Sequence, residues 1–556
     1  MQSVFTELKR RHVYRTAAFY AAAGWLLVQV ATQVAPYFNL PNWAVRLIIV
    51  AVVGGFPIVI MLSWYYEWSP SGGLRRENDT DGDRAAAIAP AAAPSRDAAT
   101  PVTSDMSIAV LSFVDMSQAR DQEYFSDGLA EEVMNLLAQL PQLRVIARTS
   151  SFSFKGKGTD VATIGRTLGA AHVLEGSVRK AGDRLRVTAQ LIRTGDSSHL
   201  WSQTFERELT DIFLVQDEIA GAVVAALKVK LLPEQQLRNL HRTDNTEAYD
   251  AYLLGQTVLR AGRYDDSQQA LMAFERSIAL DRNYAAGYAG LASAQSAVAD
   301  YEKNAERRSA LKLEALITAE SAIELEPELA DGYVVRGQLR YRQLWDWQGA
   351  QTDLQRALAL EPNSTDVLLQ NALLLHNLNH MVEAIALVGR VTATDPLSWM
   401  AWLMLGATLR NSGRMAEGRV ALKRSLELNP QASWTRHVLG VLELLEGQPE
   451  LALATFQQAG APYRQCGVAM AEYTLGHPHE SAQALAEAEP YAVGFSIQIA
   501  EAHAWRGERD AAFEYLERAA TLRDSGIARM RSDPMLRTLH DDPRWAMLLK
   551  KLNFPA

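Results

Sequence analysis

Histidine pairs are the residues whose spacing first suggests chemistry in this chain. His376 and His380 lie four positions apart, which would place both on one face of a helix, as in many zinc sites. They fall where a predicted helix ends, and no carboxylate accompanies them. His477 and His479 form a weaker pair because Pro478 separates them. The sequence therefore assigns no metal-ligating residue.

A glycine-rich segment is the second candidate for chemistry. Residues 156–159 read Gly-Lys-Gly-Thr, but the spacing differs from that of a phosphate-binding loop, so a turn is favoured. The H-E-x-x-H, G-x-S-x-G and protein-kinase signatures do not occur in the sequence. A triad assembled from scattered Ser, His and Asp residues stays open. We expect no enzyme, and we assign no catalytic or cofactor-binding residue.

Cysteine content and charge exclude further classes of protein. The single cysteine, Cys466, rules out an intramolecular disulfide and a cysteine-rich zinc site, and it reads as a small buried residue. A reactive thiol is the alternative, for which Arg464 is the only nearby cation. The net charge of -9 comes without a basic stripe, so we expect no nucleic-acid partner.

Two apolar runs near the amino end predict a membrane anchor. Residues 16–45 and 47–66 carry no charge, and each is long enough to cross a ~30 Å hydrocarbon layer with ~20 helical residues. Prolines and asparagines between 36 and 42 indicate a short turn. The sequence therefore predicts a two-pass hairpin over residues 1–71. A buried helical pair in a soluble protein is the alternative.

The distribution of positive charge predicts the orientation of this hairpin. Basic residues flank its outer ends, whereas only Arg46 lies in the turn. The outer residues are Lys9, Arg10, Arg11 and Arg15 before the runs and Arg75, Arg76 and Arg84 after them. We therefore expect both termini on the cytoplasmic side of the membrane.

A tether and a compact unit follow the hairpin. Residues 72–104 are rich in alanine and proline and lack hydrophobic periodicity, which is typical of a flexible linker. Residues 105–232 alternate strand and helix patterns in the order β-α-β-α-β-β-β-α, which predicts a mixed sheet with helices packed on it. Ser126 and Asp127 are expected to cap the first helix of this α/β domain.

This unit resembles the amino-terminal domain of TolB, in the version fused to tetratricopeptide repeats in bacterial membrane proteins. The matching segments are SIAVLSFVDMS, DQEYFSDGLAEEV, LRVIARTSSFSFKGK, GRTLGAAHVLEGSVRKAGDRLRVTAQLI and HLWSQTFERELTDIFLVQDEIA. The resemblance implies an interaction domain without established chemistry. Ser112 stands where proline is usual in these relatives.

The remaining chain is repetitive. Prolines recur at intervals of 35, 34 and 34 residues, which is the tetratricopeptide period. They are Pro327, Pro362, Pro396 and Pro430. Small and large residues keep step with them, so about eight helix pairs are expected over residues 245–525. The segment RSDPMLRTLHDDPRWAMLLKKL resembles the terminal cap of the same fused proteins, which implies a helical cap over residues 526–556. Residues 294–311 read as an insertion between two helices.

The expected architecture is multidomain: a membrane hairpin, an α/β domain and an all-α solenoid. A solenoid of this kind presents a concave groove to partner peptides, so we expect a scaffold or adaptor at a bacterial inner membrane, with protein partners and no identifiable small-molecule substrate. Trp345, Trp347, Trp399 and Trp402 are possible groove anchors, although packing in the core is favoured. An envelope-assembly factor facing the periplasm and a small-ligand sensor or enzyme remain as alternatives.

Overall fold

The computed structural model describes residues 66–68, 74–76, 106–118, 121–228, 241–260, 262–302 and 304–555. The chain forms two compact units, Met1–Ala98 and Ala99–Ala556. In the first unit, strand β1 (Tyr66–Trp68) pairs antiparallel with β2 (Leu74–Arg76), a pairing that the sequence did not predict. Most of the predicted hairpin and linker lies outside the described residues. Among the residues that are described, no helix has the length and apolar character needed to cross a bilayer.

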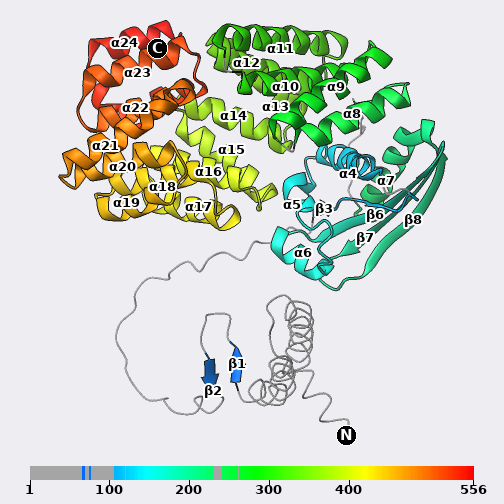
Figure 1. Cartoon of the computed structure of the whole chain (residues 1–556). Coiled ribbons are helices and arrows are strands. Elements are labelled where there is room, and N and C mark those ends of the chain that lie inside the picture. Colours follow the sequence, from blue (N-terminus) through cyan, green and yellow to red (C-terminus); the bar gives the residue numbers. More distant parts are fainter. Residues whose placement is uncertain are drawn as a thin grey trace, which may run out of the picture. The chain divides into compact units, whose positions relative to one another are not determined.

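The second unit begins with a mixed sheet, as predicted. Its strands run in the order β5-β3-β6-β7-β8, and β4 pairs with β6 (Figure 1). The pairs of β3 with β5 and β6 are parallel, whereas β6, β7 and β8 form an antiparallel meander. The strands are β3 (Ser107–Val110), β4 (Val114–Asp115), β5 (Arg144–Ile146), β6 (His172–Ala181), β7 (Arg184–Arg193) and β8 (His199–Glu208).

Helices cover both faces of this sheet. Buried residues of α4 and α7 share one apolar core with β3, β7 and the first repeat helices, while α6 packs against the opposite side of β3, β5 and β6. A short helix, α5, follows β5 directly. The helices are α4 (Glu123–Ala138), α5 (Arg148–Phe152), α6 (Val161–Leu168), the 3-10 turn η1 (Leu209–Asp211) and α7 (Ile212–Ala226).

The predicted cap of α4 is wrong. The helix begins at Glu123 with Gln122 as its first flanking residue, so Ser126 and Asp127 lie inside it and are buried. The Ser126 hydroxyl donates a hydrogen bond to the Gln122 carbonyl oxygen, and an Asp127 carboxylate oxygen accepts one from Lys155 at 2.7 Å. A capping residue needs a non-helical backbone, and that position falls four residues earlier than expected.

Eight antiparallel helix pairs follow within the described residues. The first helix of each pair contacts the first helix of the next pair, so these helices line the inner surface of the solenoid. The pairs are α8 (Thr246–Leu259) and α9 (Tyr264–Leu280), α10 (Ala285–Tyr301) and α11 (Ala305–Leu325), α12 (Ala330–Leu339) and α13 (Trp347–Leu360), α14 (Thr365–Asn377) and α15 (Met381–Thr394), α16 (Trp399–Asn411) and α17 (Met415–Leu428), α18 (Ser433–Leu445) and α19 (Pro449–Gln457), α20 (Tyr463–Thr474) and α21 (Pro478–Ala488), and α22 (Ala492–Trp505) and α23 (Arg509–Thr521).

The repeat signals act as expected. Each of the four periodic prolines follows the end of a second helix by two residues, because proline cannot continue the helix. Gly406 permits the close approach of α16 and α17, since a Cβ atom there would lie 2.6 Å from Leu422 Cγ. The predicted insertion at residues 294–311 is wrong, because this segment forms the end of α10 and the start of α11. The extra residues lengthen two helices.

The carboxyl end folds back onto the middle of the solenoid. It comprises η4 (Ser525–Ser532), η5 (Pro534–Leu539), α24 (Pro543–Lys551) and the residues after it. Trp347 Nε1 donates to the Leu552 carbonyl oxygen at 2.9 Å, and the Trp347 ring stacks on Phe554 with centroids 4.3 Å apart. Trp345 follows the π-helical turn η2 (Arg340–Leu344) and is also buried. Both residues therefore pack in the core.

Candidate functional site

The inner surface of the solenoid has two halves with different occupants. In the carboxyl-terminal half, η4 and η5 lie against the inner faces of α14, α16 and α18. Asn411 Nδ2, for example, donates a hydrogen bond to the Ser532 carbonyl oxygen at 2.9 Å. The space that remains is a cavity of about 60 Å³. This half of the groove is therefore filled by the chain itself, and we call it the filled half.

A buried ion-pair network holds the filled half together. Arg529 Nη2 lies 2.5 Å from a carboxylate oxygen of Glu501, whose side chain is only 2 % exposed. His437 Nε2 approaches the same carboxylate to 3.3 Å. Burial alone would raise the pKa of Glu501, but Arg529 and His437 hold it well below its ordinary value. Burial and the neighbouring Glu501 carboxylate raise the pKa of Asp533 to about 7.

His376 belongs to this half, where both of its ring nitrogens have protein partners. Its Nδ1 lies 3.0 Å from Thr408 Oγ1, and its Nε2 lies 3.3 Å from Asn411 Nδ2. Burial, together with Arg410 and Arg529, lowers the pKa of His376 to about 3. His380 is exposed at the start of α15, so the two histidines do not converge.

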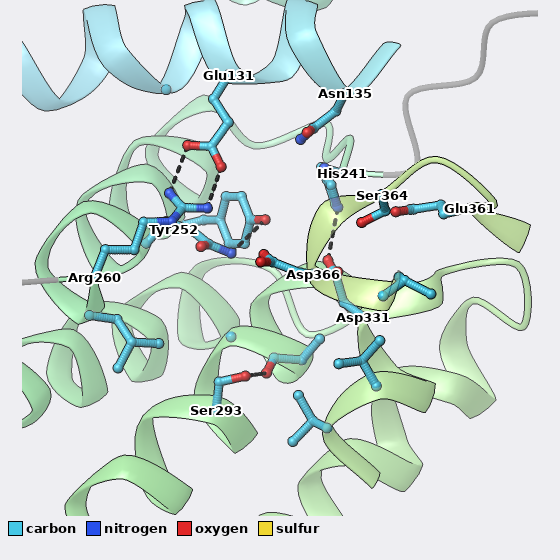
Figure 2. Close-up of a pocket in the computed structure, with 18 of the residues that line it drawn as sticks. Glu131, Asn135, His241, Tyr252, Arg260, Ser293, Asp331, Glu361, Ser364 and Asp366 are labelled. Atoms are coloured by element: carbon cyan, nitrogen blue, oxygen red, sulfur yellow. Dashed lines mark hydrogen bonds and ion pairs between the residues drawn. The ribbon is translucent and has the colours of Figure 1, made fainter. Parts of the chain in front are cut away.

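The amino-terminal half of the groove is hollow. Helix α4 lies over the inner faces of α8, α10, α12 and α14 and leaves a cavity of about 330 Å³ between them (Figure 2). A second cavity of about 600 Å³ continues beneath α5. We call these two cavities and their lining the hollow half. The α/β domain is held over it through contacts at both ends: Tyr124 Oη donates to Asp250 at 2.9 Å, and Ser150 Oγ donates to Asp395 at 2.5 Å.

Ion pairs from three elements cross the hollow half. Glu131 on α4 accepts two hydrogen bonds from the guanidinium of Arg260, the residue that follows α8, one of them at 2.7 Å from Nη1. The Nε atom of Arg148, on α5, lies 3.1 Å from Glu131 as well. Burial raises the pKa of Glu131, and the two guanidinium groups oppose this shift. One carboxylate thus joins the α/β domain to the first repeat.

His241 makes a second bridge. Its Nδ1 lies 3.0 Å from Glu132 on α4, and its Nε2 lies 3.0 Å from Asp331 on α12. An imidazole can donate to two carboxylates at once only when both ring nitrogens carry protons. Burial would lower the pKa of His241, but the two carboxylates raise it well above its ordinary value. His241 is therefore an imidazolium that ties α4 to the third helix pair.

Two further carboxylates lie on this cavity without a cation. Within the described residues, no Lys, Arg or His nitrogen lies within ion-pair distance of Glu361 or Asp366. Burial and the nearby Asp331 charge raise the pKa of Glu361 to about 7, whereas Asp366 is exposed to solvent. Figure 2 shows the Asp366 carboxylate projecting into the space enclosed by Arg260, His241 and Asp331. The two cavities thus have five carboxyl groups, those of Glu131, Glu132, Asp331, Glu361 and Asp366, but three cationic groups.

Amide and hydroxyl groups complete the lining. Gln338 on α12 and Gln370 on α14 come from neighbouring repeats, and Ser293 lies on α10. The side-chain oxygen of Gln370 is buried and has no hydrogen-bond partner among the described residues. The side chain of Asp331 is 40 % exposed, so the cavity is open to solvent on that side. This half can accept a polar group with hydrogen-bond donors.

None of the hollow-half residues was singled out from the sequence. One signal was present: Asp331 and Asp366 are 35 residues apart and start equivalent helices of consecutive repeats. Of the other residues considered, Cys466 is fully buried, and burial raises the pKa of its thiol, which confirms the expected packing role. Gly156 and Gly158 adopt positive φ angles of 71° and 58°, as suits the expected turn.

Comparison with known proteins identifies the repeats. A model of the tetratricopeptide repeat matches residues 401–431, which span α16 and α17. The solved structure of YrrB, a TPR protein with an unusual peptide-binding site, is 19% identical, covering 38% of this chain and 97% of that one, with a TM-score of 0.28. PilW, a type IV pilus biogenesis factor, is 21% identical over 36% of this chain and 93% of its own, with a TM-score of 0.32. The helix geometry and the family model together establish tetratricopeptide repeats in this chain.

A curated relative corrects one expectation. "Putative adenylate cyclase 3" of Rhizobium meliloti (strain 1021) is 40% identical over 186 residues, which are 33% of this chain and 32% of the relative. The chain thus matches about a third of that protein's length. The expectation that the chain is not an enzyme is contradicted, because a relative of this identity carries an enzyme's name.

Proposed function

We propose that this chain is a membrane-anchored interaction scaffold that binds partner peptides in the hollow half of its groove. The observation that carries the proposal is the open, polar cavity between α4 and the inner faces of four repeat helices. Inner surfaces of repeat solenoids commonly receive peptides. The cavity between η4, η5 and the repeat helices of the filled half measures about 60 Å³, so a partner would enter between α4 and the repeats.

The proposal places the α/β domain in the binding site itself. Glu131, Glu132 and Asn135 of α4 face Gln338 and Asp366 of the repeats across the same cavity. A peptide held there would contact both parts of the unit, and the two surfaces expected from the sequence would act as one. Binding between two walls orders a flexible peptide at more points than an open groove does.

In vivo cross-linking followed by affinity purification of the full chain tests this function. A matched variant, Gln338→Trp, would fill the cavity with a larger side chain. We expect a reproducible partner with the natural chain that is depleted at least several-fold with the variant. A chain that captures no partner, or captures the same partner with the cavity filled, would refute the proposed site.

The membrane anchor is part of the proposal and has its own test. The apolar runs at residues 16–45 and 47–66, and the basic residues outside them, support a two-pass anchor with the repeats in the cytoplasm. Reporter fusions after residue 232, one active only in the cytoplasm and one only after export, would distinguish the two orientations. Export activity would instead favour the periplasmic assembly role.

A second candidate is a role in adenylate cyclase signalling, which the Rhizobium relative favours. In this role the chain either makes cyclic AMP itself or binds and regulates a protein that does. Cyclic AMP production from ATP by the purified full chain, with Mg²⁺ or Mn²⁺ supplied, tests the first possibility. Cyclase activity in the purified partner complex tests the second, and its absence in both preparations would reject this candidate.

A further inference from the structure

We propose that the hollow half recognises a basic side chain, a lysine or arginine, of an extended partner peptide. The inference rests on the proposed function and adds the chemistry of its partner. The carboxylates of Glu361 and Asp366 lie on the cavity without a paired cation among the described residues, while the cations nearby are engaged elsewhere.

The ion pairs already present account for every cation on the cavity wall. Arg148 and Arg260 both bind Glu131, and His241 lies between Glu132 and Asp331. Two arginines and one imidazolium thus face five carboxyl groups along the two cavities, and these include Glu361 and Asp366. A guanidinium or ammonium group from outside would balance the excess negative charge.

Hydrogen bonding favours the same kind of group. The buried side-chain oxygen of Gln370 has no partner in the described structure, and it lies on the same wall as Asp366. A guanidinium carries five N–H donors and no acceptor, so it suits a site made of carboxylate and amide oxygens. An acidic or phosphorylated peptide would face repulsion here.

The opening and the flanking groups fit a side chain attached to a peptide. Asp331 is exposed on the rim, whereas Glu132, which faces it across His241, is 5 % exposed. The cavity of about 330 Å³ is larger than one basic side chain, which leaves room for neighbouring backbone. The side-chain amides of Gln338 and Gln370 can hydrogen-bond the backbone of the bound peptide whatever its other side chains are.

The test measures binding of two synthetic peptides to the purified full chain by fluorescence anisotropy. Both are nine-residue peptides of glycine, serine and glutamine; one carries two arginines and its twin carries two glutamates. We expect the arginine peptide to bind at least about tenfold more tightly than its twin. The double variant Glu361→Gln with Asp366→Asn should weaken the arginine peptide at least about tenfold.

A matched control removes two exposed carboxylates far from the cavity, Glu450→Gln with Glu480→Gln, and should leave binding unchanged. The cavity substitutions remove repelling charges without changing side-chain size, so the variant should melt no lower than the natural chain. Equal binding of the two peptides, or of the arginine peptide to both cavity forms, would overturn the proposal. A chain that binds spermidine but does not bind the arginine peptide would also overturn the proposal.

The same double variant separates this inference from the proposed function. If cells yield a partner with the natural chain and an undiminished amount with the double variant, the basic-residue inference fails while the scaffold function stands. If the natural chain yields no partner, the scaffold function itself fails. Loss of the partner with the double variant, but not with the control, supports both.

Discussion

The filled and hollow halves of the groove are built from the same kind of helix pair. They differ in whether cations of the chain itself pair with the carboxylates in the groove. In the filled half, Arg529 and His437 converge on a single buried carboxylate, Glu501, and the chain's own η4 and η5 complete the contact. In the hollow half, Glu361 and Asp366 are left without a cation in the described structure. An ion-pair network whose charges are all paired by the chain itself stabilises the fold, whereas unpaired carboxylates can bind a cationic ligand.

The largest expected effect tests the filled half. Replacing Arg529 by Met leaves Glu501, at 2 % exposure, with a buried charge and no guanidinium, which should cost about 4 kcal/mol of stability. Thermal unfolding and hydrogen exchange of α22 in the full chain measure the loss. Arg531→Met, which removes a donor to the exposed Pro555 carbonyl oxygen, serves as the control and should cost less than about 0.5 kcal/mol. Equal costs would mean that η4 does not depend on the ion pair.

The next effect tests how firmly α4 covers the hollow half. His241→Gln removes the imidazolium between Glu132 and Asp331, which should cost about 3 kcal/mol. Since the folded pKa of His241 is raised, its contribution is complete below its ordinary pKa of 6.5 and is lost as pH rises through the raised value. The penalty should therefore shrink in alkaline solution. Hydrogen exchange of α12 at two pH values checks this, and a penalty independent of pH would contradict the charged bridge.

Glycine substitutions test whether the helix pairs of the two halves are equivalent. An added Cβ at Gly337 in the hollow half would lie 2.9 Å from Leu354 Cγ, and one at Gly406 in the filled half would lie 2.6 Å from Leu422 Cγ. Each alanine variant should lose about 2 kcal/mol through overpacking. Gly389→Ala has open space and should lose nothing or gain up to about 1 kcal/mol. If only one of the two alanine variants lost stability, the filled and hollow halves would differ in how their helices pack, and not only in the residues that line the groove.

The smallest effect concerns the pH dependence of the hollow half. The folded pKa of Glu361 is about 7 against an ordinary 4.5, so the folded chain keeps a proton that the unfolded chain releases, and stability falls as pH rises across this interval. Glu361→Gln removes that term. The melting temperature of the variant should drop less between pH 5 and pH 8 than that of the natural chain, by roughly 2 °C. Asp533, whose pKa is also about 7, is present in both the natural chain and the variant, so its contribution to the pH dependence is the same in the two. Identical pH profiles of the melting temperature would therefore contradict the raised pKa of Glu361.

Local rules made most of the second unit's fold predictable. The periodic prolines end helices wherever they occur, and alternating residues with short turns produced the meander β6-β7-β8. The capping residue of α4 was assigned wrongly because Ser126 and Asp127 are common cap residues that here lie inside the helix. Residues 294–311 were wrongly predicted to be an insertion because they extend α10 and α11. No proline or glycine in the sequence marks where such an extension begins.

The division of the groove could not be predicted from the sequence. Glu131 and Arg260 are 129 residues apart, and Trp347 and Leu552 are 205 apart, so only the packing of the whole unit brings them together. The resemblance implied a helical cap but not that η4 and η5 enter the groove. The equivalent positions of Asp331 and Asp366 in consecutive repeats could be read from the sequence. That both line a cavity follows only from the position of α4 opposite them.

Photo-cross-linking from one position in each half tests the central claim most directly. A photoactivatable phenylalanine derivative would replace Gln338 in the hollow half or Trp434 in the filled half of the full chain, and cross-links would be mapped by mass spectrometry. We predict partner cross-links from position 338, and internal cross-links to residues 525–539 from position 434. Partner cross-links from position 434, with none from position 338, would contradict the account.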